Sequence, residues 1–349
     1  MTKVECTELR PEYIVSRVIK GGWQLAGDHG KVDRVNAVRD MLEFVDAGIV
    51  TFDCADIYTG VESMIGGFIQ LLRRNRGEQA LNGIKVHTKF VPDYDRLARI
   101  NRDYVVGIID RSLQRLRLER LDLVQFHWWD YAIPGFLDTL MILDELRQEG
   151  KIDKLGVTNF DATHISKITA AGIDLVSAQV QYSLLDHRPA GEFTECCRAR
   201  NVSLLCYGVL AGGFISRRWL GKADPGYRFD NRSLVKYRLI IDEFGGWPLF
   251  QILLTVLDEL AKRHRVSLSA VAMRFILDRP QVAAVIIGAR YADYLPATLA
   301  AFDFTLTARD IAALEEVLAQ RSGPHGPVYA LERDRNGRHG RIMKYNLNE

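Results

Sequence analysis

The feature that most constrains the fold is a regular alternation of short apolar, β-branched runs with amphipathic segments along most of the chain. Such runs predict buried strands, and the segments between them carry apolar residues at helical spacing. In the first helix, Asp33 is a plausible N-cap and Gly48 ends the pattern. The predicted strands are 18–21, 49–52, 85–89, 121–126, 154–157, 175–180, 202–207 and 282–287. The predicted helices are 33–47, 62–73, 102–116, 135–149, 162–171, 190–200, 248–264 and 291–300.

Eight strand-then-helix units predict an α/β fold of the (β/α)₈ TIM-barrel type, which usually needs about 250 residues plus insertions. The 349 residues are enough for one such barrel. A doubly wound sheet is the alternative. It is disfavoured because the order of units shows no topological break and no G-x-G-x-x-G follows the first strand.

We therefore expect one barrel domain over 1–349, with extra length in three places: 1–16, 211–265 and the C-terminal tail 323–349. Loops that follow barrel strands face the active site, so the insertion between strands seven and eight is either a lid or substrate wall, or a solvated crossover loop. The tail is basic and rich in Gly and Pro. A solvated terminus is the first expectation; an arm folded over the barrel mouth and a self-association element are the alternatives.

Composition narrows the class of protein. The net charge of +2 argues against a nucleic-acid binder. No apolar signal region opens the chain, and no run reaches the length of a membrane span, so no membrane partner is expected. The five cysteines lack zinc-type spacing and form no disulfide framework, which favours a reduced, cytoplasmic protein without a metal site. Composition does not predict an oligomeric state.

Four ionisable residues follow or end predicted strands: Asp53, Tyr58, Lys89 and His127. The carboxyl ends of parallel barrel strands meet at one mouth, where barrels place their chemistry. A lysine ammonium beside a tyrosine lowers the pKa of the phenol, and a carboxylate keeps that lysine charged. A histidine there adds a second hydrogen-bond donor. This set can polarise a carbonyl group and protonate the alkoxide that forms from it.

Each residue also has an ordinary structural role as its alternative. Asp53 could cap a helix, Lys89 could extend to solvent, and Tyr58 could pack against the barrel. Only the combination of the four points to catalysis.

The residues that carry this chemistry also resemble the aldo-keto reductase family, over roughly residues 14–320. Residues 52–58, Phe-Asp-Cys-Ala-Asp-Ile-Tyr, resemble that family's F-D-T-A-x-x-Y element, with Cys54 in place of Thr. Glu62 and Gly66 fit the E-x-x-x-G that follows. The resemblance implies Tyr58 as the general acid and base, Lys89 and Asp53 as the groups that tune it, and His127 as the residue that orients the carbonyl.

The same resemblance implies a nicotinamide cofactor site. Residues 156–160 resemble G-x-S-N-F, residues 207–213 resemble Y-x-x-L-x-x-G, and 287–290 resemble P-G-A-R. Asn159 and Gln179 would bind the carboxamide, and Thr158 keeps the hydroxyl of the motif. Tyr207 would stack on the nicotinamide ring, and Leu210 and Gly212, in a loop that also includes Gly208, would lie along the pyrophosphate. Gly288 and Arg290 belong to the segment at the adenosine end. Gly22, Trp23 and Asp53 line the same cleft.

NADP (NADPH) is the expected cofactor, because a guanidinium such as that of Arg290 suits a 2′-phosphate. NAD is the alternative, since residues 294–298 lack the polar groups that the family usually places around the adenine. Arg290 as a solvated surface charge is also left open.

The predicted partner is a small-molecule carbonyl compound or the corresponding alcohol. Four aromatic residues are candidates for the substrate wall, with barrel-top packing as the alternative: Trp23, Trp128, Trp129 and Tyr131. We expect a carbonyl reductase. The alternatives are a cofactor-binding regulatory subunit that serves a partner protein, and an enzyme that works as an alcohol or sugar dehydrogenase.

Overall fold

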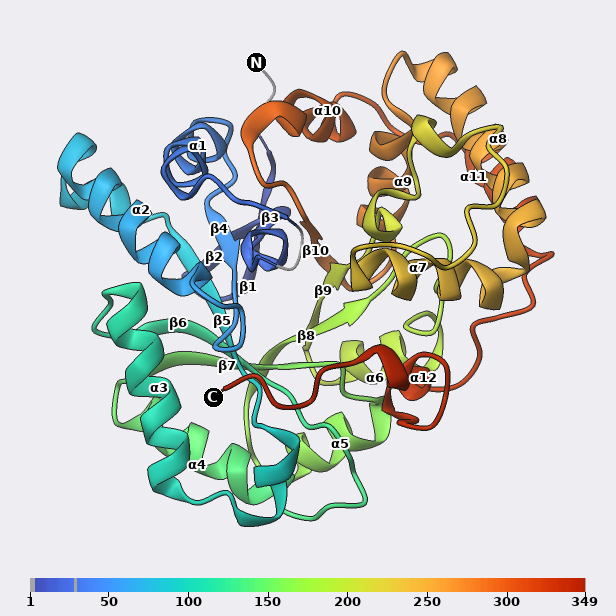
Figure 1. Cartoon of the computed structure of the whole chain (residues 1–349). Helices are drawn as coiled ribbons and strands as arrows, with labels where there is room; N and C mark the ends of the chain where they lie inside the picture. The colour runs from blue at the N-terminus through green and yellow to red at the C-terminus, as the bar shows by residue number, and fades with distance from the viewer. Residues whose placement is uncertain (1–3, 28–29, 349) are drawn as a thin grey trace.

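The computed structural model describes residues 4–27 and 30–348. Its centre is a closed barrel of eight parallel strands in the order β10-β3-β4-β5-β6-β7-β8-β9, with helices around it (Figure 1). The predicted (β/α)₈ barrel is confirmed. The barrel strands are β3 (Val18–Gly21), β4 (Thr51–Asp53), β5 (Lys85–Phe90), β6 (Leu121–Phe126), β7 (Ile152–Thr158), β8 (Leu175–Gln181), β9 (Ser203–Tyr207) and β10 (Val282–Ile287).

The surrounding helices follow the strands much as the apolar spacing predicts. They are α1 (Arg34–Asp46), α2 (Val61–Arg76), α3 (Arg102–Leu116), α4 (Phe136–Gln148), α5 (Ala162–Ala170), α6 (Glu192–Ala199), α7 (Arg232–Phe244), α8 (Gly246–His264), α9 (Leu268–Leu277), α10 (Leu295–Leu299), α11 (Ala308–Leu318) and α12 (Ala330–Arg333). Short 3₁₀ turns lie at Trp23–Leu25, Glu78–Leu81, Tyr94–Arg99, Ala211–Gly213, Arg217–Trp219, Ala292–Tyr294, Ala300–Phe302 and Gly340–Ile342.

The N-terminal segment, expected only as extra length, forms an antiparallel hairpin of β1 (Cys6–Arg10) and β2 (Tyr13–Ser16). Tyr13 and Val15 are buried while Ile14 between them is exposed, as strand alternation requires. The buried side chains pack with Leu123 and Leu205 from the barrel strands. The hairpin therefore covers one end of the barrel and leaves the other end for the site.

Four helices were not predicted: α7 within the insertion, α9, α11 and the short α12 in the tail. The predicted helix over 248–264 is α8, which meets α7 at an angle of 92°. The prediction of one continuous helix over 291–300 is wrong. This segment instead forms the 3₁₀ turn Ala292–Tyr294, the short α10 and a second 3₁₀ turn that begins at Ala300.

The expectation of a solvated tail is wrong. After α11 the chain runs back across the barrel mouth and ends near β5 (Figure 1). Tyr329, Glu332 and His339 are all buried. The tail is basic in composition, but its charges find partners: Glu332 pairs with Arg188 at 2.9 Å and Arg338 pairs with Asp242 at 3.0 Å.

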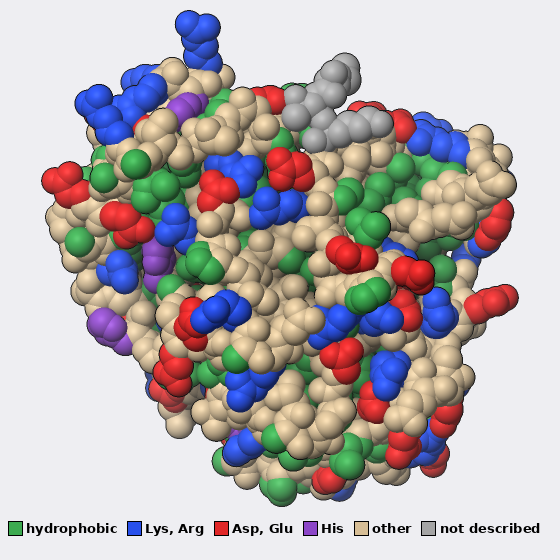
Figure 2. Space-filling view, turned by 180° about the vertical axis from the view of Figure 1, so that it is seen from behind, with side chains coloured by type: hydrophobic (Ala, Val, Ile, Leu, Met, Phe, Trp, Pro, Cys, Tyr) green, Lys and Arg blue, Asp and Glu red, His purple; other side chains and the backbone are tan. Residues whose placement is uncertain are grey.

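The outer surface carries mixed charge. Figure 2 shows Lys and Arg side chains interspersed with Asp and Glu on the face opposite to that of Figure 1. In the described part of the chain no single helix is long and apolar enough to span a membrane, although the bent pair α7 and α8 meets the length and composition criteria together.

Gly66 lets α2 and α3 approach closely, and a substitution there tests this packing. A Cβ at Gly66 would lie 2.3 Å from the carbonyl oxygen of Arg115, whereas a Cβ at the neighbouring Gly67 would meet nothing within 4 Å. We expect Gly66→Ala to lower the free energy of unfolding by about 2 kcal/mol, because the backbone of α3 cannot move aside cheaply. Gly67→Ala, the control, should raise it by up to about 1 kcal/mol through helix propensity. Denaturant unfolding of both variants is the measurement, and equal effects would contradict the proposed close approach.

Candidate active site

The four expected catalytic residues meet at the mouth opposite the hairpin. Asp53 ends β4, Lys89 lies in β5, His127 follows β6, and Tyr58 lies in the turn that leads into α2. The ammonium of Lys89 donates to Asp53 Oδ2 at 2.6 Å and to the carbonyl oxygen of Cys54 at 2.7 Å. Lys89 Nζ also lies 5.0 Å from the centroid of the Tyr58 ring. The structure therefore brings a carboxylate, an ammonium and a phenol into one cluster.

Burial sets the charge states of this cluster. Burial alone would lower the pKa of Lys89, but Asp53, with help from Tyr58, outweighs it and raises the pKa above its ordinary value. Burial also raises the pKa of Tyr58 to about 12, and the opposing effect of Lys89 offsets only part of that rise. Lys89 does act in the expected direction, but the expectation that the pKa of Tyr58 lies below its usual value is wrong, because burial outweighs Lys89.

Asp53 is held by more than Lys89. Its Oδ1 accepts from Gln125 Nε2 at 3.0 Å and from Gln179 Nε2 at 2.7 Å. Both amides are buried. Gln125 was not among the predicted site residues; its position in a buried strand, beside apolar neighbours, was the one signal that could have identified it. The carboxylate thus has a charged partner and two neutral donors.

His127 is buried and its orientation is fixed by the backbone. Its Nδ1 lies 3.1 Å from the carbonyl oxygen of Thr158. Because a carbonyl oxygen can only accept, Nδ1 carries the hydrogen in this bond. Burial and the positive charge of Arg333 lower the pKa of His127 to about 3, so the ring is neutral. Its Nε2, which has no partner among the described residues, is then a hydrogen-bond acceptor rather than the expected donor.

The residues expected at the carboxamide form a hydrogen-bonded polar group on β7, β8 and β9 and their exits. Asn159 has a left-handed backbone with φ 63°, its N–H donates to the Gln179 carbonyl oxygen at 2.9 Å, and its Oδ1 accepts from the Tyr207 hydroxyl at 2.8 Å. Among the described residues, no hydrogen bond engages Asn159 Nδ2 or Gln179 Oε1. The Asn159 amide NH₂ is left as a donor and Gln179 Oε1 as an acceptor. A primary carboxamide offers the complementary C=O and NH₂ groups, so these residues fit a nicotinamide. Thr158 lies buried beside them.

The insertion covers the predicted pyrophosphate loop. A Cβ at Gly208 or Gly212 would lie 2.7 Å from the Tyr237 side chain of α7, and both glycines have positive φ. Ser233 of α7 accepts a hydrogen bond from Trp23 Nε1 at 2.9 Å. Of the two readings of the insertion, the solvated crossover is therefore wrong for α7 and applies only to the exposed stretch 221–230. Leu210, also predicted along the pyrophosphate, lies between these two glycines in the same loop.

A buried network of charges lies beside Tyr207 and was not predicted. Arg188 donates to Asp186 at 2.7 Å and to Glu332 at 2.9 Å, and Lys236 lies 3.9 Å from Glu332. The Lys236 ammonium is also 5.0 Å from the centroid of the Tyr207 ring. The network therefore joins β8's exit loop, α7 and the tail behind the ring expected to stack on nicotinamide.

Gly288, expected at the adenosine end of the cofactor, follows β10, lies against the Gln24 side chain and is exposed. Arg290 is half-buried beside Gly30. Arg290 forms no ion pair within residues 4–27 and 30–348. Its guanidinium is thus available to a phosphate. Residues 28–29, which precede Gly30 in the sequence, lie outside the described part of the chain.

Two of the four expected aromatic wall residues lie near the catalytic groups. The Trp23 ring lies 4.9 Å from that of Tyr58, and the Trp129 ring lies edge-on to His127 at 4.4 Å. Trp128 is fully buried against Phe126, so its assignment to the substrate wall is wrong. Tyr131 stacks on His164 and packs under Arg333 instead of facing His127.

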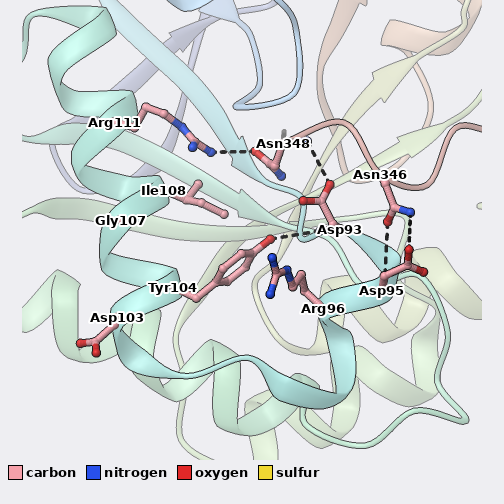
Figure 3. Close-up of a pocket in the computed structure, with 10 residues that line it drawn as sticks. All are labelled: Asp93, Asp95, Arg96, Asp103, Tyr104, Gly107, Ile108, Arg111, Asn346 and Asn348. Carbon is pink, nitrogen blue, oxygen red and sulfur yellow. Dashed lines mark hydrogen bonds between the residues drawn. The ribbon is translucent and has the colours of Figure 1, made fainter.

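The end of the tail is fastened outside the catalytic cluster, beside a cavity of about 340 Å³ next to α3 (Figure 3). The backbone N–H groups of Leu347 and Asn348 donate to Asp93 at 2.7 and 2.9 Å. Asn348 also accepts from Arg111 at 3.0 Å and donates to the Val91 carbonyl oxygen at 2.6 Å. These contacts hold the tail across the mouth. In this position the Tyr329 ring packs edge-on against the His127 ring, with 5.6 Å between the two ring centroids.

Comparison with known proteins gives the family. A sequence model of the aldo/keto reductase family matches residues 17–319. The aldo-keto reductase YhdN of Bacillus subtilis is 28% identical over 325 residues, which cover 90% of this chain and 93% of that protein. The NADH-specific methylglyoxal reductase of Escherichia coli is 25% identical over 327 residues, which cover 87% of this chain and 94% of that protein.

The solved structures support the fold. The glycerol dehydrogenase AKR11B4 from Gluconobacter oxydans superposes with a TM-score of 0.73 at 24% identity, over 93% of this chain and 97% of that one. At this identity the likeness concerns the barrel and not the substrate.

Glu332 offers a test of how the tail is anchored. Burial alone would raise its pKa, but Arg188 and Lys236 lower it to about 2. Its contribution to stability is therefore complete above the unfolded pKa of 4.5 and is lost as the pH falls toward 2. We expect Glu332→Gln to lower the free energy of unfolding at neutral pH by about 3 kcal/mol, because Arg188 and Lys236 lose a buried counter-charge. The variant should also lose stability less steeply in acid than the parent protein.

The measurement is denaturant unfolding across this acid range. Glu195→Gln, which removes an exposed ion pair with Arg198, is the matched control and should change stability by less than about 1 kcal/mol. An equal effect of the two variants would show that Glu332 does not anchor the tail.

Proposed function

The chain belongs to the aldo/keto reductase family, whose members are oxidoreductases that use NAD(P)H and reduce carbonyl groups, and we propose that it transfers hydride between NADP(H) and an aldehyde or ketone. The observation that carries the proposal is the Asp53–Lys89 pair beside the Tyr58 ring, at the mouth that His127 also faces. We propose the cytoplasm as its location, in keeping with five unpaired cysteines.

In this proposal a bound reduced nicotinamide supplies the hydride to the carbonyl carbon. Tyr58 donates its proton to the carbonyl oxygen, so that the C=O group becomes CH–OH and the phenol becomes a phenolate. Lys89 stabilises the phenolate, and Asp53 keeps Lys89 charged in the buried site. The reverse reaction uses the same groups, with the phenolate taking the proton of an alcohol.

His127 is proposed to orient the carbonyl through Nε2, which is buried at the mouth. Donation to a carbonyl oxygen requires the neutral tautomer with its hydrogen on Nε2. That tautomer gives up the bond from Nδ1 to Thr158, so the bond to the substrate forms at the cost of one buried hydrogen bond. The aromatic rings of Trp23 and Trp129 then form the apolar sides of the substrate space.

The proposed preference for NADPH rests on Arg290, whose guanidinium is unpaired within the described ranges and suits a 2′-phosphate. NADH is the competing cofactor, because a relative of similar length is named as NADH-specific. Initial rates with both cofactors, over a panel of aldehydes, ketones and alcohols, decide between them and identify the substrate class.

Tyr58→Phe is the direct test of the proton donor. The ring stays in place but cannot donate, so we expect kcat for carbonyl reduction to fall by about 10² or more while cofactor affinity changes little. Tyr227→Phe, which removes the hydroxyl of an exposed tyrosine on the insertion, is the control. Unchanged turnover in Tyr58→Phe would refute the assignment. Tight cofactor binding by the parent protein, with no turnover over the whole panel, would instead indicate a regulatory subunit.

The charge state of Tyr58 also predicts the pH dependence. Carbonyl reduction needs the protonated phenol, and burial raises the pKa of Tyr58 to about 12. We therefore expect kcat/KM for reduction to stay level through the neutral and moderately alkaline range, and kcat/KM for alcohol oxidation to rise with pH over that range. Stopped-flow rates in both directions provide the measurement, with unfolding followed in the same buffers as the control. A reduction rate that falls near neutral pH would contradict this ionisation.

A further inference from the structure

Arg333, in the tail, donates hydrogen bonds to two loops of the active site, the one that follows β6 and the one that follows β7. One terminal nitrogen of its guanidinium donates to the carbonyl oxygens of Trp128 and, at 3.0 Å, Trp129, which follow His127. The other donates to the Tyr131 hydroxyl at 2.8 Å and to the carbonyl oxygen of Asn159 at 2.6 Å. The guanidinium also lies 3.8 Å from the centroid of the Tyr131 ring.

These contacts use all four N–H groups of the two terminal nitrogens. The remaining N–H, on Nε, is buried and has no hydrogen-bond partner among the residues that the structure describes. Within the described ranges no carboxylate pairs with Arg333. A guanidinium engaged in this way is unsuited to hold a phosphate or a carboxylate ligand, and its effect must pass through the backbone groups that it fixes.

The most consequential of these groups is the peptide of Asn159. This residue has a left-handed backbone with φ 63°, a conformation that asparagine adopts more readily than most other non-glycine residues. Its N–H is fixed by Gln179 and its side-chain oxygen by Tyr207. Arg333 supplies the third point of attachment, on the carbonyl oxygen. Asn159 is therefore held at its backbone N–H, its backbone carbonyl oxygen and its side-chain oxygen, which gives Nδ2 a defined direction.

We propose that Arg333 is a positioning residue for the nicotinamide end of the cofactor, acting through the Asn159 backbone. This inference rests on the proposed function, and it takes Asn159 Nδ2 as the donor to the carboxamide of the nicotinamide. The same guanidinium holds the backbone that follows His127, so the cofactor side and the substrate side of the site are fixed relative to one another. The tail thus contributes to the geometry of hydride transfer without touching either reactant.

The test compares binding of the whole cofactor with binding of a fragment that lacks nicotinamide. The probes are NADPH with 2′-phospho-ADP-ribose, or NADH with ADP-ribose if the parent protein prefers NADH. We expect Arg333→Met to weaken binding of the whole cofactor about tenfold and binding of the fragment less than twofold. Methionine keeps part of the apolar stem, so packing on Tyr131 is disturbed less than by Ala.

Arg335→Met is the matched control. Arg335 belongs to the same tail and stacks on Tyr94 at 4.0 Å, but makes no contact with Asn159. Its substitution should leave both affinities unchanged. If Arg333→Met does not fold, Arg333→Lys replaces it, because an ammonium keeps the charge but cannot reach all four acceptors.

A double-mutant cycle with Asn159→Ala separates the possible failures. The effect of Arg333→Met on cofactor affinity should largely disappear in the Asn159→Ala background. If Asn159→Ala alone does not weaken whole-cofactor binding, the proposed carboxamide site fails. If Asn159→Ala weakens it and Arg333→Met does not, or if Arg333→Met weakens the fragment equally, the positioning role fails while the proposed function stands.

Discussion

The site depends on the contact between Lys89 and Asp53, two side chains that are each about 5% exposed. Burying an ammonium and a carboxylate is costly unless both are fully hydrogen-bonded. Here Asp53 also accepts from Gln125 and Gln179, while Lys89 also donates to the backbone of Cys54. The pair fixes a positive charge beside Tyr58 and, through Gln179, is connected to the residues proposed to bind nicotinamide. One carboxylate therefore connects the proton-transfer side of the site with its cofactor side.

The barrel supplies the reactive groups, and elements outside the barrel exclude water from them. Helix α7 covers the glycine loop after β9, and the tail lies over His127 through Tyr329. This burial explains both charge states at the mouth, since it disfavours the charged forms of Tyr58 and His127. The network of Arg188, Glu332 and Lys236 then fastens the two covering elements to each other and to the barrel.

The sequence predicts what depends on local pattern. The strands were found within a few residues, because apolar runs mark buried strands, and Asp53, Tyr58, Lys89 and His127 could be placed at one mouth by the topology of a barrel. The contacts of Arg333 could not be predicted, since three of its partners are backbone carbonyl oxygens that no residue type encodes. The raised pKa of Tyr58 was missed for a similar reason: burial arises from many distant residues, whereas the opposing Lys89 is a single recognisable one.

The long sequence separation between the tail and its partners affects the order in which the parts of the chain fold. Each strand from β3 to β9 pairs with the next along the chain, whereas Arg333 bonds to residues 174 to 205 positions before it. Contacts between remote positions require closure of a long loop, and chains rich in them fold slowly. Most strand pairing can thus be complete while the last residues are still undocked. In a refolding experiment, enzyme activity would then return after the spectroscopic signal of the β-structure, and the lag between the two would measure the docking of the C-terminal tail.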